Sequence, residues 1–251
     1  MFLNGVFNMK VAIVTGSSKG IGKACAIRLA KDGYTVVVNY SSSDKAAEET
    51  LAQIKADGGD GIIYKADVSD LAQVKQMMRD VYKQFGSIDV LVNNAGIVRD
   101  EYLLMLNPET MDKCLDLNVK GYIYCAQQAV LKMFKQKHGV IVNMSSVSSK
   151  MALPGQSVYS ATKGAVNSLT ATLAKELSGY GIRVNAVCPG FIATDMIDAI
   201  PEETLKGYLD AIPMHRYGTA EDVANVVSSL CSDDFAYMTG QTLVLDGGLS
   251  L

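Results

Sequence analysis

The segment KVAIVTGSSKGIG, residues 10–22, decides the fold class. Its first half, up to Thr15, is an almost uninterrupted apolar run, which is typical of a parallel β-strand buried on both faces. A glycine-rich turn follows from Gly16 to Gly22, and apolar side chains at helical spacing continue to Ala30. The order strand, glycine turn, helix predicts the start of a β–α–β unit.

The same alternation continues along the chain. Six more apolar runs predict strands at residues 35–40, 61–66, 88–92, 139–144, 182–187 and 241–245. Helices are predicted at residues 44–57, 70–85, 108–137, 157–180 and 220–231, with one or two short helices within 194–217. Strands that alternate with helices indicate a doubly wound α/β fold with a parallel sheet of about seven strands. We predict a single domain over residues 9–251, preceded by an N-terminal extension at residues 1–8.

Composition narrows the class of protein. Of 251 residues, 49% are hydrophobic and 20% are charged, which is typical of a soluble globular protein. The net charge of -3 argues against a general nucleic-acid binder. No apolar run is long enough to span a membrane, so we expect a cytoplasmic protein with no membrane partner.

Cysteine and histidine usage argues against a metal site. The five cysteines show no CxxC spacing, and the only histidines are His138 and His215. We expect reduced structural thiols, including Cys188, and no metal centre.

Polar clusters follow the predicted strands. They are Gly16–Gly22, Asn39–Ser41, Asp67, Asn93–Gly96, Ser145–Ser146 and Pro189–Thr194. Ligands of open parallel sheets bind beyond the carboxyl ends of the strands, so these clusters predict one shared site.

Tyr159 and Lys163 are four positions apart in a predicted helix and should face the same cleft. A nearby ammonium favours the phenolate, so the pair predicts a proton donor and its electrostatic partner. Taken alone, the spacing also fits an exposed helix face with a lysine that reaches into solvent.

Taken together, these motifs resemble the short-chain dehydrogenase/reductase family over about residues 10–248. The matching residues are Thr15-Gly-x3-Gly-Ile-Gly22, Asp67, Asn93-Asn-Ala-Gly96, Asn118, Ser146, Tyr159-x3-Lys163 and Pro189-Gly190 with Thr194. Within the family the chain is most similar to the 3-oxoacyl-[acyl-carrier-protein] reductases. Three phrases carry that likeness, at residues 93–100, 189–196 and 238–248.

The resemblance implies four catalytic residues. Tyr159 would protonate the substrate carbonyl oxygen as hydride arrives, and Lys163 would lower the Tyr159 pKa and bind the nicotinamide ribose. Ser146, with Tyr159, would bind the substrate carbonyl. Asn118 would hold a water that links Lys163 to solvent.

The cofactor implied is NADP(H). No acid stands in Asn39-Tyr-Ser41, where one would bind the ribose of NAD and repel a 2′-phosphate, and Lys19 supplies a cation in the glycine turn. The predicted cofactor residues are Gly16, Ser17, Ser18, Lys19, Gly20, Ile21, Gly22, Ser41, Asp67, Val68, Asn94, Gly96, Tyr159, Lys163, Ile192 and Thr194.

The substrate implied is a 3-oxoacyl thioester, with a substrate lid at residues 191–217 and a homotetrameric assembly. Lys132, Lys135, Lys137 and His138 could dock an acidic acyl carrier protein, but Tyr180 stands where similar reductases carry a basic residue. A coenzyme A thioester, a polyketide-type chain or another ketone therefore remain alternatives. Two further alternatives are NAD-dependent oxidation of a secondary alcohol and a non-catalytic NADP-binding protein.

Overall fold

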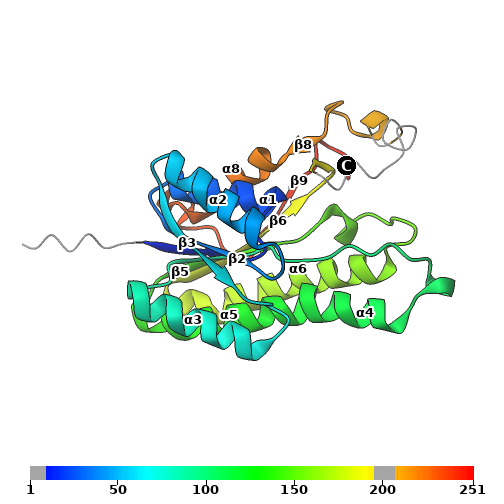
Figure 1. Ribbon diagram of the computed structural model, residues 1–251. Coiled ribbons are helices and arrows are strands. Elements are labelled where there is room, and N and C mark those ends of the chain that lie inside the picture. Colours follow the sequence, from blue (N-terminus) through cyan, green and yellow to red (C-terminus); the bar gives the residue numbers. More distant parts are fainter. Residues whose placement is uncertain (1–9, 195–206, 208) are drawn as a thin grey trace, which may run out of the picture.

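The computed structural model describes residues 10–194, 207 and 209–251. Its centre is a seven-stranded parallel sheet in the order β3-β2-β1-β4-β5-β6-β9 (Figure 1). The strands are β1 Val11–Val14, β2 Thr35–Tyr40, β3 Asp60–Lys65, β4 Val90–Asn93, β5 Gly139–Met144, β6 Ile182–Pro189 and β9 Thr242–Leu245. The predicted doubly wound α/β fold with about seven parallel strands is confirmed.

Helices cover both faces of the sheet (Figure 1). One layer holds α1 Gly20–Lys31, α2 Asp44–Ala56 and α8 Ala220–Cys231. The other layer holds α3 Leu71–Phe85, α4 Pro108–Leu115, α5 Gly121–Gln136 and α6 Ser157–Leu177. Short 3₁₀ turns lie at Leu103–Met105, Val147–Ser149, Ser178–Tyr180 and Asp233–Phe235.

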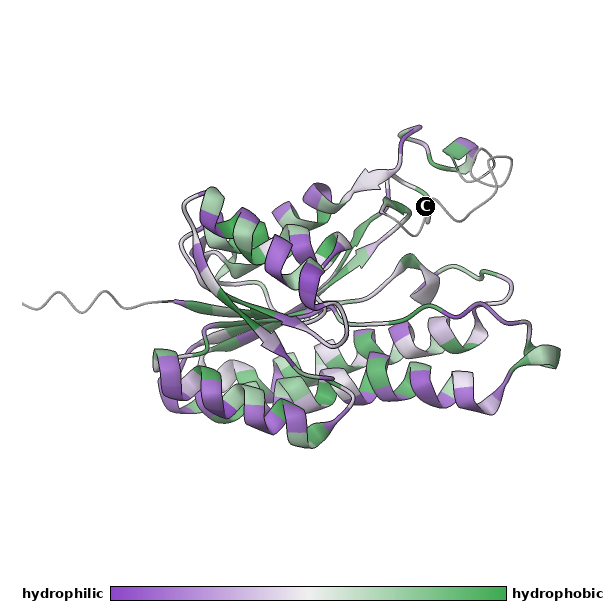
Figure 2. Ribbon diagram, viewed as in Figure 1, coloured by the Kyte–Doolittle hydropathy of each residue, from purple (hydrophilic) through white to green (hydrophobic). Residues whose placement is uncertain are grey.

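Burial follows the position of each strand in the sheet. Every residue of β1, β2 and β4 is buried, because helices cover both faces of these inner strands. The edge strands β3 and β9 are only partly buried. Figure 2 shows the same distribution, with hydrophobic residues in the sheet and hydrophilic ones on the outer faces of the helices.

The long helix predicted at 108–137 differs in the structure. It is divided into α4 and α5 by a π-helical turn over Asp116–Lys120. The side chain of Asn118 explains the irregularity, because its amide bonds both the N–H and the C=O of Ile97, at 2.9 Å each. Such π turns often occur at functional sites. The helix predicted at 157–180 ends at Leu177 and finishes in a 3₁₀ turn.

The order of the strands in the sheet indicates where a ligand would bind. β1 lies between β2 and β4, and the chain leaves β1 toward one side and β4 toward the other. Open sheets of this kind bind ligands in a crevice where the strand order reverses, outside the carboxyl ends of the two strands. The glycine turn and the segment after Asn93 both lie there.

The predicted lid begins and ends beside this crevice. β7 Ile192–Ala193 pairs with β8 Gly218–Thr219, which joins the two ends of the segment. Residues 195–206 and 208 of the predicted lid lie outside the described residues, as does the predicted N-terminal extension at 1–8.

Candidate active site

The glycine turn requires glycine at two positions where neighbouring protein atoms approach its backbone closely. Gly16 has φ of +61°, and a Cβ there would lie 2.8 Å from the Cα of Ala95. A Cβ on Gly22 would overlap the Gly16 carbonyl oxygen and the Asn94 amide. Only glycine fits at either position, so the turn packs closely on itself and on the segment after β4.

Two side chains brace this turn against the end of β4. Thr15 Oγ1 accepts from the backbone N–H groups of Asn94, at 2.9 Å, and Ala95, at 3.0 Å. Asn94 Nδ2 donates back to the carbonyl oxygens of Thr15, at 3.0 Å, and Gly16, at 3.1 Å. The Asn94 amide group therefore holds the turn itself.

Ser17 holds the turn from the other side. Its hydroxyl donates to the Val14 carbonyl oxygen at 2.7 Å, and the side chain is fully buried. Its backbone N–H donates to the Asn39 carbonyl oxygen at 2.8 Å. Ser17, which we predicted as a cofactor contact, thus has its hydroxyl and its N–H bonded within the protein, where they shape the turn.

Asn39 fills the end of β2. Its Oδ1 accepts from Gly16 N at 3.3 Å, and its Nδ2 donates to the carbonyl oxygens of Tyr64, at 3.2 Å, and Ala66, at 3.0 Å. The amide thus links three neighbouring strands and is buried. Ser41, two residues on, is exposed beside it.

The N-terminus of α1 offers free donors to an anion. Lys19 is the N-cap residue in an extended conformation, and its side chain makes no capping bond. The first turn of α1 has no acidic residue. The first N–H groups of a helix lack partners within it and attract phosphate. Together with the glycine gap, this arrangement fits the pyrophosphate of a dinucleotide.

The remaining predicted cofactor residues line the same crevice edge. Asp67 is exposed and Val68 is buried at the end of β3. Across the glycine turn, the methyl group of Thr194 lies 3.9 Å from the position of a Cβ on Gly20. Ile192 is buried in β7, two residues before Thr194. Ser18 and Ile21 are half-buried.

Tyr159 and Lys163 face the same space on α6. The Lys163 ammonium lies 5.7 Å from the centre of the Tyr159 ring. Lys163 is 3% exposed, and its Nζ donates to the Met144 carbonyl oxygen at 2.8 Å. Ser146 lies just after β5, with its hydroxyl within hydrogen-bonding reach of Tyr159. The structure therefore brings together three of the four predicted catalytic side chains.

Asn118 completes this cluster from the π turn. Its Oδ1 lies 3.1 Å from the position of a Cβ on Gly96, and Lys163 Nζ lies 3.7 Å from the same point. Asn118 Nδ2 also donates to Thr162 Oγ1 at 3.2 Å. The amide is thus bonded to Ile97 and Thr162, which fixes its side chain beside Lys163.

Burial controls the protonation of the pair. Burial raises the pKa of Tyr159 to about 12, and the Ser146 hydrogen bond only partly opposes it. Burial also lowers the pKa of Lys163 to about 8. We predicted that Lys163 lowers the Tyr159 pKa; in the ligand-free protein the loss of water is the largest influence on that pKa. Tyr159 therefore keeps its proton at neutral pH.

A chain of hydroxyl and amide groups extends from Ser146, and sequence reasoning missed it. Ser146 Oγ donates to Ser148 Oγ at 3.1 Å, and Ser148 Oγ donates to Gln156 Oε1 at 2.7 Å. Gln156 Nε2 then donates to Asp100 Oδ2 at 3.2 Å. The chain orients the Ser146 hydroxyl. Only folding brings these segments together, so no local signal pointed to them.

Tyr122 was also missed. It contacts Lys163 from α5, and its ring centre lies 5.1 Å from Nζ. One signal was available, because Tyr122 follows Asn118 by four residues, a spacing that puts two helical side chains on one face.

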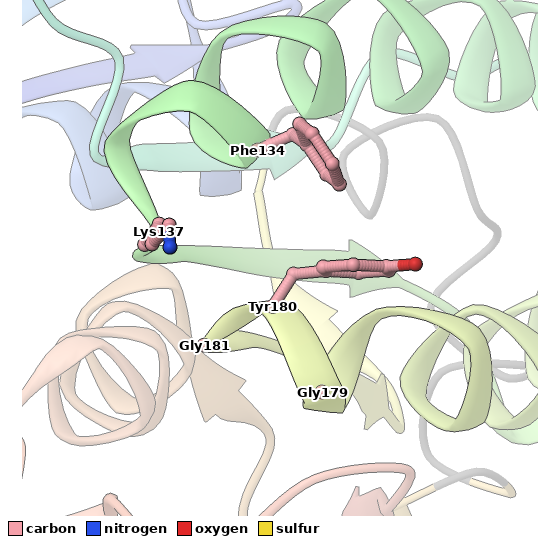
Figure 3. A pocket seen from close by; sticks show the side chains of 5 residues that line it. All are labelled: Phe134, Lys137, Gly179, Tyr180 and Gly181. Carbon is pink, nitrogen blue, oxygen red and sulfur yellow. The ribbon is translucent and has the colours of Figure 1, made fainter.

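The predicted docking lysines are dispersed. Lys132 lies over the Tyr82 ring at 5.0 Å, and His138 Nε2 contacts Asp89 Oδ1 at 2.7 Å. Lys137 lines a pocket with Gly179, Gly181 and the aromatic side chains of Phe134 and Tyr180 (Figure 3). The two aromatic ring centres are 4.7 Å apart. Lys137 is thus the basic residue that adjoins Tyr180.

The part of the chain that the structure describes contains no cluster of three or more metal-ligating side chains. None of its helices combines the length and apolarity needed to cross a membrane. All five cysteines are unpaired and buried.

Comparison with known proteins agrees with this architecture. A family model described as enoyl-(acyl carrier protein) reductase matches residues 16–250. The 3-oxoacyl-[acyl-carrier-protein] reductase of Staphylococcus aureus (strain Mu50) is 47% identical over 240 residues, which cover 96% of this chain and 98% of that protein.

Solved structures share the fold at high similarity. A gluconate 5-dehydrogenase from Burkholderia cenocepacia, in complex with NADP and tartrate, has a TM-score of 0.91 and 32% identity over 99% of this chain and 96% of its own. An acetoin dehydrogenase from Salmonella typhimurium has a TM-score of 0.87 and 38% identity over 96% of each chain. The strand order, the glycine turn, the residues gathered around Tyr159 and these likenesses lead to one conclusion: the chain belongs to the short-chain dehydrogenase/reductase family of oxidoreductases.

Proposed function

We propose that this protein is a reductase that converts the 3-oxo group of an acyl thioester into a 3-hydroxyl group, in fatty-acid biosynthesis. One observation carries the proposal: Tyr159, Lys163 and Ser146 meet beside a glycine turn that fits a dinucleotide. Relatives named 3-oxoacyl-[acyl-carrier-protein] reductase, similar over nearly the full chain, support the substrate class.

The chain's own residues supply the acid and the charge stabilisation. When bound, NADPH supplies a hydride to the carbonyl carbon. Tyr159 donates its phenolic proton to the carbonyl oxygen, which completes the alcohol. The Ser146 hydroxyl, which donates to Ser148 Oγ in the ligand-free protein, would turn its proton to the same oxygen as negative charge develops on it. Lys163 stabilises the phenolate that Tyr159 leaves behind, and Asn118 keeps Lys163 in reach of a proton from solvent.

The cofactor we propose is NADP(H). Lys19 is exposed next to the free N–H groups of α1, where a 2′-phosphate would meet a cation. Asn39 and Ser41 put no negative charge at the end of β2 that would repel it. Asp67, Val68, Asn94, Gly96, Ile192 and Thr194 lie around the same crevice, where we propose that they contact the cofactor.

An acyl carrier protein is the partner we propose for docking. Carrier proteins are acidic, and Lys137 presents a cation beside the exposed aromatic pair of Phe134 and Tyr180 (Figure 3). On this surface Lys137 would bind an acidic side chain of the carrier protein, and the two aromatic rings would contact an apolar one.

We also propose a cytoplasmic homotetramer. Leu131 on α5 and Val244 on β9 are exposed at 54% and 40%, on the elements that would form its contacts. Analytical ultracentrifugation of the purified chain should give the mass of four 26.9 kDa chains. A monomer at micromolar concentration would refute this assembly.

Oxidation of NADPH and of NADH tests the function, each with acetoacetyl-coenzyme A and with an acetoacetyl carrier protein. We expect turnover with NADPH, and faster turnover on the carrier protein. Turnover on neither thioester would refute the proposal. Because an acetoin dehydrogenase shares 38% identity, acetoin and diacetyl should be assayed beside them. Turnover on these alone would assign a small-ketone reductase.

A further inference from the structure

We propose that Tyr122 is a positioning residue whose hydroxyl holds the Lys163 ammonium beside Tyr159 and keeps it charged in a site that excludes water. The inference deepens the proposed reductase function and rests on it for its catalytic consequence. Tyr122 lies outside every motif that identified the family.

The contact is a closed triangle of polar atoms. Lys163 Nζ donates to Met144 O at 2.8 Å and to Tyr122 Oη at 3.4 Å. Tyr122 Oη donates its own proton to the same Met144 carbonyl oxygen at 3.2 Å. Because that proton points to Met144, the lone pairs of Tyr122 Oη are left to accept from the ammonium.

The ammonium has few other sources of stabilisation. Lys163 is 3% exposed, and among the described residues no carboxylate forms an ion pair with it. The titratable groups that face it are the phenols of Tyr122 and Tyr159 and the thiol of Cys188. Asp100 acts on Tyr159 rather than on Lys163. A buried cation held only by dipoles and ring faces responds strongly to the loss of one acceptor.

The fold gives Tyr122 little freedom to leave this position. Its side chain is 1% exposed and lies in the first turn of α5, directly after the π turn. A Cβ on the preceding residue, Gly121, would lie 3.2 Å from the Val68 carbonyl oxygen, so α5 packs tightly against the loop after β3. Asn118 and Tyr122, one turn apart, therefore reach Lys163 from the same helix face.

Titration of Lys163 in the ligand-free protein tests the inference directly. The protein is labelled with ¹³C at lysine Cε, and the Lys163 signal is assigned by its loss in Lys163→Met. In Tyr122→Phe we expect the titration midpoint of Lys163 to fall by about half a unit to one unit, because a charge-stabilising acceptor is lost. Tyr124→Phe removes a hydroxyl from the same helix away from Lys163 and should leave the midpoint unchanged.

Equal midpoints in wild type and Tyr122→Phe would overturn the inference and leave Tyr122 with a packing role. If Tyr122→Phe loses its near-ultraviolet circular dichroism, 3-fluorotyrosine at position 122 keeps the shape and weakens the acceptor. Its midpoint should then fall in the same direction, and an unchanged midpoint would again refute the role.

The pH profile of turnover provides a second measurement. The alkaline limb of kcat should move to lower pH in Tyr122→Phe, and the limb in Tyr124→Phe should coincide with wild type. If wild type turns over neither thioester, the proposed function fails. The Lys163 titration still decides the role of Tyr122 in that case, because it needs neither substrate nor cofactor.

Discussion

At the scale of single residues, the proposed chemistry depends on a phenol and a buried ammonium that lie side by side on α6. Burial keeps the proton on Tyr159, and it makes Lys163 lose its proton more easily. In both groups burial disfavours the charged form, so it raises the pKa of the acid and lowers the pKa of the base. Each can be tested by one substitution.

Replacing Tyr159 removes the proposed proton donor. In Tyr159→Phe we expect turnover to fall by about 10²-fold to 10⁴-fold, the usual contribution of a positioned acid. NADPH binding, followed by fluorescence titration, should change little because the ring remains. Tyr124→Phe is the matched control. Full activity in Tyr159→Phe would rule out the acid role.

Replacing Lys163 should change how stability depends on pH. Its pKa is about 8 in the folded protein and has an ordinary value of 10.5. Between these values the unfolded chain binds more protons, so the wild-type fold gains stability as pH rises. We therefore expect the stability advantage of Lys163→Met over wild type to shrink by about 3 kcal/mol from pH 7 to pH 10.5. Urea unfolding of ligand-free protein at both pH values measures this, and a constant difference would contradict it.

Replacing Lys19 tests the choice between the two nicotinamide cofactors. In Lys19→Ala the Kd for NADPH should rise much more than the Kd for NADH, since only NADPH carries the 2′-phosphate. Lys55→Ala, at the far end of α2, is the control. Similar losses for both cofactors would show that Lys19 does not read the phosphate.

At the scale of elements, the sequence predicted regular structure well and irregular structure poorly. The buried strands and the glycine turn follow from local pattern, because burial on both faces requires continuous apolar runs. The π turn at Asp116–Lys120 does not, because it depends on a bond between Asn118 and the distant Ile97. For the same reason the series of hydrogen bonds that runs from Ser146 to Asp100 could not be predicted, although Ser146 itself was predicted from its motif.

The start of α1 offers a test of the glycine turn. A methyl group at Gly22 would overlap the Gly16 carbonyl and the Asn94 amide, so Gly22→Ala should distort the turn. We expect weaker NADPH binding and a lower Tm. Gly164→Ala is the control, since nothing lies within 4 Å of its Cβ position. As a helix-interior change it should stabilise the fold by about 0.5–1 kcal/mol. Unchanged NADPH affinity in Gly22→Ala would show that the turn does not hold the cofactor.

At the scale of the whole molecule, the chain is acidic, with a net charge of -3, and its proposed carrier-protein partner is acidic too. Docking must therefore depend on a local cation. The sequence indicated a cluster of lysines, but in the structure Lys132 and His138 have turned to Tyr82 and Asp89. Of the predicted patch, Lys135 and Lys137 stay exposed, and Lys137 is the one that lies beside the aromatic pair of Phe134 and Tyr180.

Reversing the charge of Lys137 tests that surface. In Lys137→Glu we expect KM to rise several-fold for the acetoacetyl carrier protein, through repulsion, and to stay the same for acetoacetyl-coenzyme A. Lys55→Glu makes the same change in net charge on α2 and should affect neither substrate. A parallel rise for both thioesters in Lys137→Glu would show that the residue does not distinguish the carrier.

The buried amide of Asn39 has a consequence for anyone who wishes to redesign this protein for NADH. An acid at the end of β2 is the usual device for binding the free ribose hydroxyls. At position 39, Asp would lose the donor to Tyr64 and Ala66 and would place a charge in the sheet. At position 41 the side chain already faces solvent, so Asp can be accepted there without that cost. Natural substitutions that change the coenzyme should therefore occur at position 41, after β2, and should leave Asn39 within the strand unchanged.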